Sequence, residues 1–278
     1  MGFALLALMG AASWGVGDFL GGLSARRAHV VTVLVLSQAV GLAGVALWAI
    51  VAAEPPADLL DLAPAVGAGA AGAVGLGALY RGMAIGAMGV VAPISAASPI
   101  VPLTVDVARG VTPTASQWLG IAVVLAGIVL LAREPGSGRA GAVAGGVTLA
   151  LVAALGFGLF VVGLDAASDS SVPWTIVVAR STSTLLALVV AVSLSVPVRP
   201  GASLVPAVAA VGVFDTAANV LVAYATTRGP AGVVAVLSAL YPVVTVLLAR
   251  LFMGERLDRT KRIGGGLAIG GAALVAVG

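Results

Sequence analysis

Long runs of apolar residues, separated by short polar clusters, make up most of the chain. A helix needs roughly 20 mainly apolar residues to cross about 30 Å of hydrocarbon. Charge-free runs of about that length cover residues 30–53, 62–80, 82–105, 110–132, 140–164 and 229–249. Residues 3–23, 172–196 and 203–226 qualify with one charge each, and 263–278 qualifies if it starts nearer Arg259. The pattern predicts ten transmembrane helices joined by short loops. The N-terminal run at residues 3–23 is expected to be retained in the mature protein as the first of them.

The composition points the same way. The chain is 60% hydrophobic and only 9% charged, whereas soluble domains are about 25% charged. Too few polar side chains remain to cover a surface facing water. Because the apolar runs are continuous rather than alternating, they favour helices over a transmembrane β-barrel. We therefore expect an all-α polytopic membrane protein, located in the cell (inner or plasma) membrane as a multi-pass protein.

The inventory of reactive side chains narrows the functional classes. There are no cysteines and one histidine, His29, which argues against disulfides and against Cys- or His-based metal centres. The net charge is +3, but no basic arm interleaved with aromatic residues is present, so a nucleic-acid partner is not expected. The chain offers no paired catalytic groups. We expect no enzymatic activity, no cofactor and no bound metal.

An internal repeat is the most informative pattern in the sequence. Five residues (Gly15, Gly17, Phe19, Gly22 and Leu23) recur at an offset of 141 as Gly156, Gly158, Phe160, Gly163 and Leu164. Residues 89–92 recur as 232–235, with Ser95 matching Ser238 and Pro99 matching Pro242; Gly120 and Gly127 match Gly264 and Gly271. The order predicts two repeats, residues 1–133 and 140–278, with five helices each. Because five is odd, the second repeat is inverted in the membrane, as in many secondary transporters.

Glycines at a spacing of four predict close helix packing, since small residues let helix backbones approach each other in lipid. The pairs with this spacing are Gly17 and Gly21, Gly141 and Gly145, and Gly266 and Gly270.

Several short motifs recur in a characteristic order along the chain. They are Trp14-Gly15, the stretch 89–99 with Pro93 and Pro99, residues 239–242 (Ala-Leu-Tyr-Pro), and Gly254-Glu255-Arg256-Leu257 ahead of Gly264. With these motifs the chain resembles the drug/metabolite transporter superfamily, in particular its ten-helix EamA-type members, over essentially its full length. The first repeat departs from the pattern at residues 110–113, where the acidic residue is missing. The resemblance implies an exporter or exchanger of amino acids, related metabolites or lipophilic compounds. It also implies a central cavity lined mainly by helices 1, 3, 4, 6, 8 and 9.

Three charges lie deep within predicted spans, where an ionised group costs at least roughly 2.5–3.5 kcal/mol. Asp18 lies one turn from Trp14. It is expected to face a hydrated cavity and exchange a proton, to form a structural pair, or to lie near the interface where it is simply hydrated. Asp215 and Asn219 share a helix face, where they could hold an amine or hydroxyl of a substrate or clamp two helices together. Arg180 could bind a substrate carboxylate, but pairing with Asp18 or Asp215 is favoured.

Polar stripes on the fourth and ninth helices complete the candidate cavity. Ser95 and Ser98 are related by the repeat to Ser238 and Tyr241 and are expected to face them, unless the serines bond back to their own helices. The predicted cavity residues are Trp14, Asp18, Tyr80, Ser95, Ser98, Phe157, Arg180, Asp215, Asn219, Ser238 and Tyr241. Four other acidic residues near predicted loops are expected to be solvated: Glu54, Asp106, Asp165 and Asp169.

These observations favour a secondary transporter of small metabolites, such as amino acids or amine-bearing compounds, that works by alternating access. The alternatives are efflux of lipophilic drugs or cations coupled to protons at Asp18, or a non-transporting membrane scaffold. The expected partners are a small-molecule substrate and the lipid bilayer, with protons as a further candidate, and the protein is expected to be a monomer or homodimer. Arginines in the odd-numbered loops place both termini outside by the positive-inside rule, whereas the family resemblance implies the opposite orientation.

Overall fold

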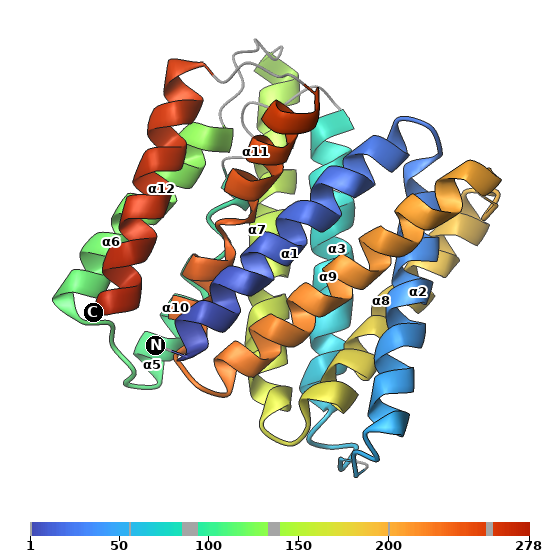
Figure 1. Cartoon of the computed structure of the whole chain (residues 1–278), viewed down its shortest axis with the longest axis horizontal. Coiled ribbons are helices and arrows are strands. Elements are labelled where there is room, and N and C mark those ends of the chain that lie inside the picture. The colour runs from blue at the N-terminus through green and yellow to red at the C-terminus, as the bar shows by residue number, and fades with distance from the viewer. Residues whose placement is uncertain (1, 56, 85–93, 133–139, 200, 254–257) are drawn as a thin grey trace.

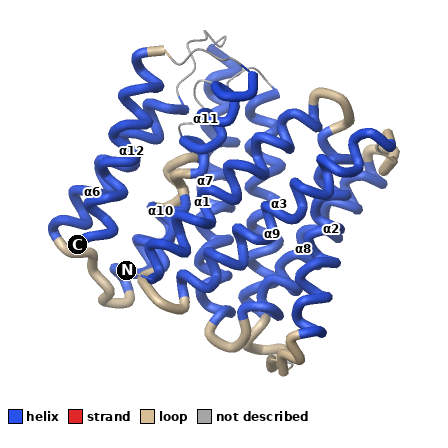
Figure 2. The backbone as a smooth tube through the Cα atoms, viewed as in Figure 1, coloured by secondary structure: helices blue, strands red, loops and turns tan. Residues whose placement is uncertain are grey.

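The structure is a computed structural model that describes residues 2–55, 57–84, 94–132, 140–199, 201–253 and 258–278. Within these ranges the regular elements are helical (Figure 2). In the first half they are α1 (Gly2–Ala25), α2 (Val30–Val51), α3 (Ala63–Ala84), α5 (Ile100–Ala108) and α6 (Ala115–Ala132). In the second half they are α7 (Ala140–Ser168), α8 (Val172–Ser193), α9 (Val205–Thr226), α10 (Ala231–Ser238), α11 (Tyr241–Met253) and α12 (Arg259–Val277), with a short 3₁₀ turn at Ala202–Leu204.

The predicted ten-segment bundle is confirmed. Six segments of the described chain are long and apolar enough to cross a membrane: α1, α2, α7, α8, the 3₁₀ turn with α9, and α10 with α11. The α3, α5, α6 and α12 helices occupy the other four predicted segments. The two termini lie at the same end of the bundle, as an even number of passes requires (Figure 1). Large apolar side chains such as Leu47, Leu151 and Leu251 are exposed on the outside, which suits a surface in contact with lipid.

The predicted start of the last helix near Arg259 is confirmed, but the fourth and ninth segments are not continuous helices. The ninth is interrupted at Ala239 and Leu240, between α10 and α11. The fourth is interrupted by a turn over residues 96–99, just before α5. Pro242 and Pro99 explain these breaks, because proline has no N–H for the helical ladder and its ring clashes with the preceding turn. Backbone bonds of the tighter i to i−3 type, such as Ser98 N to Ser95 O, bridge the first break.

Helix contacts are exchanged between the two halves, as a two-fold axis would require. The α1 helix packs along α9, and its counterpart α7 packs along α3. In the same way, α2 contacts α9 where α8 contacts α3. Three pairs, α2 with α8, α5 with α10, and α6 with α12, each join a helix to its own counterpart. The helices of each half therefore occupy equivalent places in one inverted-repeat bundle.

The glycine contacts correct the predicted register of the repeat in the first helix of each half. A Cβ at Gly15 would meet Val244 and the Tyr241 carbonyl, whereas a Cβ at Gly158 would meet Val101 and the Ser98 carbonyl. Residue 15 thus corresponds to 158 and residue 98 to 241, an offset of 143 in both cases. The match at an offset of 141 was wrong by two residues, because Gly and Phe recur often enough in α1 and α7 to align out of register.

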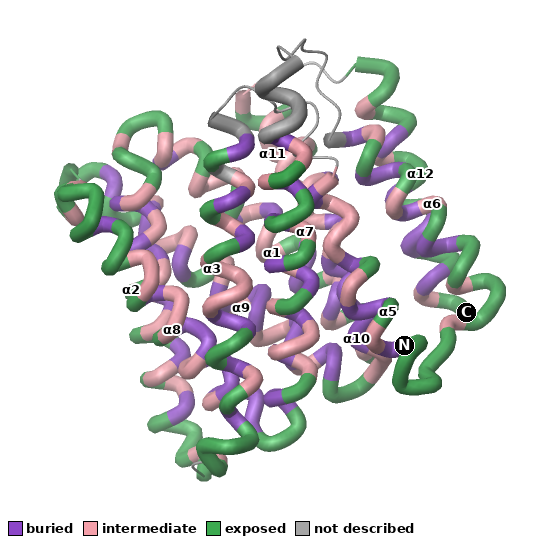
Figure 3. The backbone as a smooth tube through the Cα atoms, turned by 180° about the vertical axis from the view of Figure 1, so that it is seen from behind, coloured by how far each residue is buried: buried purple, intermediate pink, exposed green. Residues whose placement is uncertain are grey.

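The α6 and α12 helices form an antiparallel pair along one side of the bundle (Figures 1 and 3). At one crossing Gly120 faces Gly271, and at the other Gly127 faces Gly264; a Cβ on any of the four would lie 2.5–2.8 Å from backbone atoms of the facing helix. These four positions therefore have to be glycine for the helices to lie this close. The prediction that Gly266 and Gly270 form the packing face was wrong: a Cβ at either would meet nothing within 4 Å.

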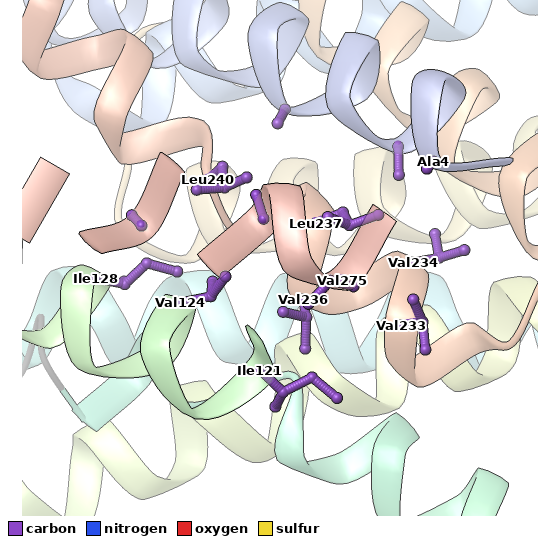
Figure 4. Packing of buried hydrophobic residues seen from close by; sticks show 14 of the residues in the cluster. Ala4, Ile121, Val124, Ile128, Val233, Val234, Val236, Leu237, Leu240 and Val275 are labelled. Carbon is purple, nitrogen blue, oxygen red and sulfur yellow. The ribbon is translucent and has the colours of Figure 1, made fainter. Parts of the chain in front are cut away.

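The largest buried cluster ties the paired helices to the centre of the bundle. Residues Ile121, Val124 and Ile128 of α6 share this cluster with residues of α10, whose eight residues are all buried (Figure 4). Ala4, Ala7 and Ala11 of α1 belong to the same cluster. Small side chains on α1 and branched ones on α10 let the two elements pack closely near the end where the termini lie.

Candidate functional site

A cavity of about 520 Å³ lies between the two halves of the bundle. Its walls come from α1, α2, α3 and the turn before α5 in the first half, and from α7, α8, α9, α10 and the start of α11 in the second. The lining is mainly apolar, with Trp14, Phe157 and Phe160 among the larger side chains. A cavity of this volume with a mainly apolar lining is typical of a binding site for small molecules.

The cavity reaches one end of the bundle and is sealed at the other. It extends to Ala25 at the end of α1 and Val30 at the start of α2, so it opens at the loop between these helices. Among the described residues, its lining begins at Trp14 on α1 and stops at Asn219 on α9. Beyond those two, Ala7, Ala11 and Val222 belong to the buried apolar cluster. The open end carries Arg26 and Arg27, and the sealed end carries the termini (Figure 1).

An ion pair lies in the cavity wall at the middle of the membrane-spanning segments. Arg180 of α8 and Asp215 of α9 are 2.5 Å apart between Nη2 and Oδ2, and the Arg180 side chain is only 4% exposed. The other carboxylate oxygen of Asp215 accepts a hydrogen bond from Nε1 of Trp14 at 3.1 Å. Of the alternatives open in the sequence, pairing of Arg180 with Asp215 is the one found. The bond from Trp14 links the halves.

Gln38 of α2 belongs to the same network and was missed in the sequence. Its Oε1 accepts hydrogen bonds from Arg180 Nη1 and, at 3.3 Å, from Ser183 Oγ. Gln38 lines the cavity together with Ser183. The signal in the sequence was an amide side chain nine residues into an otherwise apolar span, where an unpaired polar group is costly. The α2 and α8 helices face each other across the two-fold axis, so this bond also joins the halves.

Asp18 occupies a different position in the wall. It lies one turn beyond Trp14 on α1, lines the cavity and is exposed to it. No hydrogen bond or ion pair connects its carboxylate to another described residue. Unlike Asp215, Asp18 therefore has no partner among the described residues of the wall.

The remaining predicted residues are partly brought together. Ser98, Phe157, Asn219, Ser238 and Tyr241 all line the cavity, as do Trp14, Asp18, Arg180 and Asp215. The Trp14 and Tyr241 rings meet edge to face with centroids 6.3 Å apart. Ser95 is buried beside the turn before α5 and is not among the lining residues. The side chain of Tyr80 lies outside what the structure describes.

The expectation that Asp106 is solvated was wrong. The side chain is 5% exposed, and its Oδ2 accepts a hydrogen bond of 2.7 Å from the backbone N–H of Gly232 in the first turn of α10. A helix N-terminus attracts a carboxylate through its free N–H groups and its dipole. Asp165 is also not simply solvated, since it forms an ion pair with Arg109 at 3.2 Å. Asp169 is exposed, as expected.

The sequence pattern of the EamA-like transporter family matches residues 1–133 and again residues 144–277. The chain belongs to the EamA-like transporter family. It is accordingly a multi-pass protein of the cell membrane, and the resemblance noted in its motifs is confirmed.

Two individual proteins resemble the EamA-like chain. A protein of Streptantibioticus cattleyicolor named "Probable terminal-alkyne amino-acid exporter" is 40% identical over 80 residues, which is 28% of this chain and 27% of the exporter. One protein crystal structure superposes with a TM-score of 0.83 at 18% identity, covering 99% of this chain and 96% of that one. The first similarity is confined to about a quarter of each protein, and the second shows the fold alone.

Proposed function

We infer that this EamA-like protein is a secondary transporter, an exporter or exchanger of small metabolites such as amino acids or amine-bearing compounds. The observation that carries the proposal is the cavity between the inverted halves, open at one end and sealed at the other. A passive pore would be open at both ends, and a scaffold has no need of a cavity with charged side chains at membrane depth. Membership of a transporter family supports the same conclusion.

The proposed mechanism is alternating access by residues 1–133 and 140–278, each moving as a unit. In inverted repeats the second state is reached when one half rocks against the other around a central site. The sealed end is closed by apolar contacts such as Gly10 with Val222, where a Cβ on the glycine would lie 3.0 Å from a valine methyl. Contacts between small apolar side chains can part and re-form without breaking a charged bond.

The substrate class is supported by the carboxylates in the wall and by the similarity to an amino-acid exporter. Asp18 and Asp215 both line the cavity, and carboxylates are the natural partners of amines. The matched segment of the exporter is short, so it supports the class of compound and not a particular one.

The test is exchange of labelled compounds by the pure protein in liposomes. Vesicles preloaded with an amino acid, an amine or an organic acid are diluted into a trace of the same labelled compound, and accumulation of label is followed. We expect accumulation with at least one amine-bearing compound and none in vesicles without protein. Failure of every compound class with folded protein would refute the transport proposal.

A further inference from the structure

The three charged side chains in the described part of the cavity wall are not equivalent. Arg180 and Asp215 neutralise each other through their 2.5 Å ion pair. Arg180 is nearly inaccessible at 4% exposure, and its Nη1 already donates to Gln38. Its guanidinium is therefore held within the wall and is not presented to a carboxylate in the cavity.

Asp215 is occupied in the same way. One of its oxygens is paired with Arg180 and the other accepts the indole N–H of Trp14. Each carboxylate oxygen could accept a further hydrogen bond, but an ammonium ion at Asp215 would meet a carboxylate whose charge Arg180 already neutralises. The pair of Arg180 and Asp215 is thus electrically neutral, although Arg180 Nε has no hydrogen-bond partner among the described residues.

Asp18 supplies the remaining charge. It is exposed to the cavity, and no described residue is hydrogen-bonded or ion-paired with it. A carboxylate at this depth is unfavourable without a partner. The charges of the described wall therefore leave one negative site, suited to one positive group.

Two polar atoms at the other side of the network also lack partners among the described residues. They are Asn219 Oδ1 and Ser238 Oγ, on cavity-lining residues that are 7% and 2% exposed. A buried acceptor or hydroxyl without a partner is costly. Both atoms are buried, so a group of the ligand reaches them only if these side chains turn toward the cavity.

The separation of these polar ends follows from the helix geometry. The α1 and α9 helices run antiparallel and are joined by the bond between Trp14 and Asp215. A Cβ at Gly17 would lie 3.5 Å from the backbone nitrogen of Asp215, so Asp18 is about level with Asp215, and Asn219 lies one turn further along α9, roughly 5 Å at 5.4 Å per turn. Trp14 and Tyr241 lie between the two ends, so the intervening part of a ligand would contact aromatic rings.

We propose that the cavity selects amphiphilic monoamines, with the ammonium group at Asp18, an apolar body along Trp14 and Tyr241, and a hydrogen-bonding group at Asn219 and Ser238. This rests on the proposed transport function and narrows its substrates to organic cations in preference to amino acids. A carboxylate next to the amine would lie against Asp18 without a free cation to receive it. The aromatic ring of Trp14 adds a favourable surface for a cation.

Four labelled probes that differ by single groups test this selection in the same vesicle exchange assay: tyramine, tyrosine, phenethylamine and 3-(4-hydroxyphenyl)propionate. We expect tyramine to exchange fastest, phenethylamine more slowly because it lacks the hydroxyl, and tyrosine and the acid roughly 10- to 100-fold more slowly than tyramine. Tyrosine exchanging as fast as tyramine would overturn the proposal while leaving transport intact. Exchange of no compound, including the wider panel, would overturn both.

Substitution of Asp18 shows whether its charge, and not only the shape of the cavity, selects the amine. Asp18→Asn is expected to reduce tyramine exchange roughly 10- to 100-fold, and Asp18→Glu to retain most of it. Asp165→Asn, at an acidic residue outside the cavity, is the matched control and should exchange tyramine as the unmodified protein does. A folded Asp18→Asn variant with unchanged tyramine exchange would refute the assignment; if that variant does not fold, the order of the four probes decides.

Discussion

The ion pair between Arg180 and Asp215 gives a sharp test of the network, because Asp215→Asn removes one charge and little else. The asparagine keeps an oxygen that can accept the Trp14 N–H, so the change isolates the partner of Arg180. Breaking a buried pair costs roughly 3–5 kcal/mol by leaving an uncompensated charge. Because the Asp215 side chain is 35% exposed to the cavity, water can relieve part of this, and the lower end, about 3 kcal/mol, is expected.

Thermal unfolding of the purified protein, followed by intrinsic fluorescence, measures this loss. At roughly 2–4 °C per kcal/mol, Asp215→Asn should lower the Tm by roughly 6–12 °C. The double variant Arg180→Met with Asp215→Asn removes both charges and should recover most of the loss, since apolar replacements of buried pairs are often neutral. Asp165→Asn breaks a pair whose arginine is 52% exposed and should change the stability by less than about 1 kcal/mol. A Tm within about 2 °C of the unmodified protein in Asp215→Asn, or a double variant no better than the single one, would refute the reasoning.

Three further predictions concern helix packing and buried polar groups, and each is checked by thermal unfolding. Gly271→Ala places a Cβ 2.7 Å from a backbone nitrogen of α6 and should destabilise the protein by roughly 1–3 kcal/mol. Gly270→Ala, where the Cβ enters open space, should be neutral or up to about 1 kcal/mol stabilising. Equal effects of the two substitutions would contradict the contact between α6 and α12. Asp106→Ala removes the carboxylate that accepts the buried N–H of Gly232 and should lower the stability by roughly 1–3 kcal/mol. Asp106→Asn, which keeps an acceptor oxygen, should lower it less. An unchanged stability in Asp106→Ala would show that the N–H finds another acceptor. Gln38→Leu removes the acceptor of a buried guanidinium N–H of Arg180 and should lower the stability by a similar roughly 1–3 kcal/mol. Gln38→Glu keeps an acceptor and should not lower the stability. A leucine variant as stable as the unmodified protein would place Gln38 outside the network.

The spans could be predicted from the sequence because each helix must bury about 20 apolar residues in lipid, a requirement visible in any hydropathy pattern. The breaks in the fourth and ninth segments could have been anticipated from Pro99 and Pro242, but their apolar composition favours unbroken helices. The register of the repeat was harder, since Gly15 aligns in sequence with Gly156 yet corresponds in space to Gly158. The matches at an offset of 143 in the fourth and ninth segments, together with the contacts of α1 with α11 and of α7 with α5, distinguish the two alignments.

The charged part of the cavity was predictable in outline and not in its pairings. Charges within spans are rare enough that Asp18, Arg180 and Asp215 stand out directly. Which aspartate pairs with Arg180 depends on how α8, α9 and α1 are rotated against one another, and no local pattern encodes that. Gln38 was overlooked because an uncharged amide hardly disturbs an apolar run. Asp106 was misjudged because its sequence position near a loop does not reveal the N-terminus of α10 packed against it.

Filling the cavity tests the central claim, that substrates pass through the space between the two halves, most directly. Gly22 lines the cavity and has open space where its Cβ would be, so Gly22→Trp should place an indole in the passage without disturbing the fold. Gly266 has the same open space but is not among the lining residues, so Gly266→Trp is the matched control. We predict that the first variant unfolds at the normal temperature but no longer exchanges substrate in vesicles, while the second exchanges normally. A folded Gly22→Trp protein that exchanges substrate at the unmodified rate would contradict the claim.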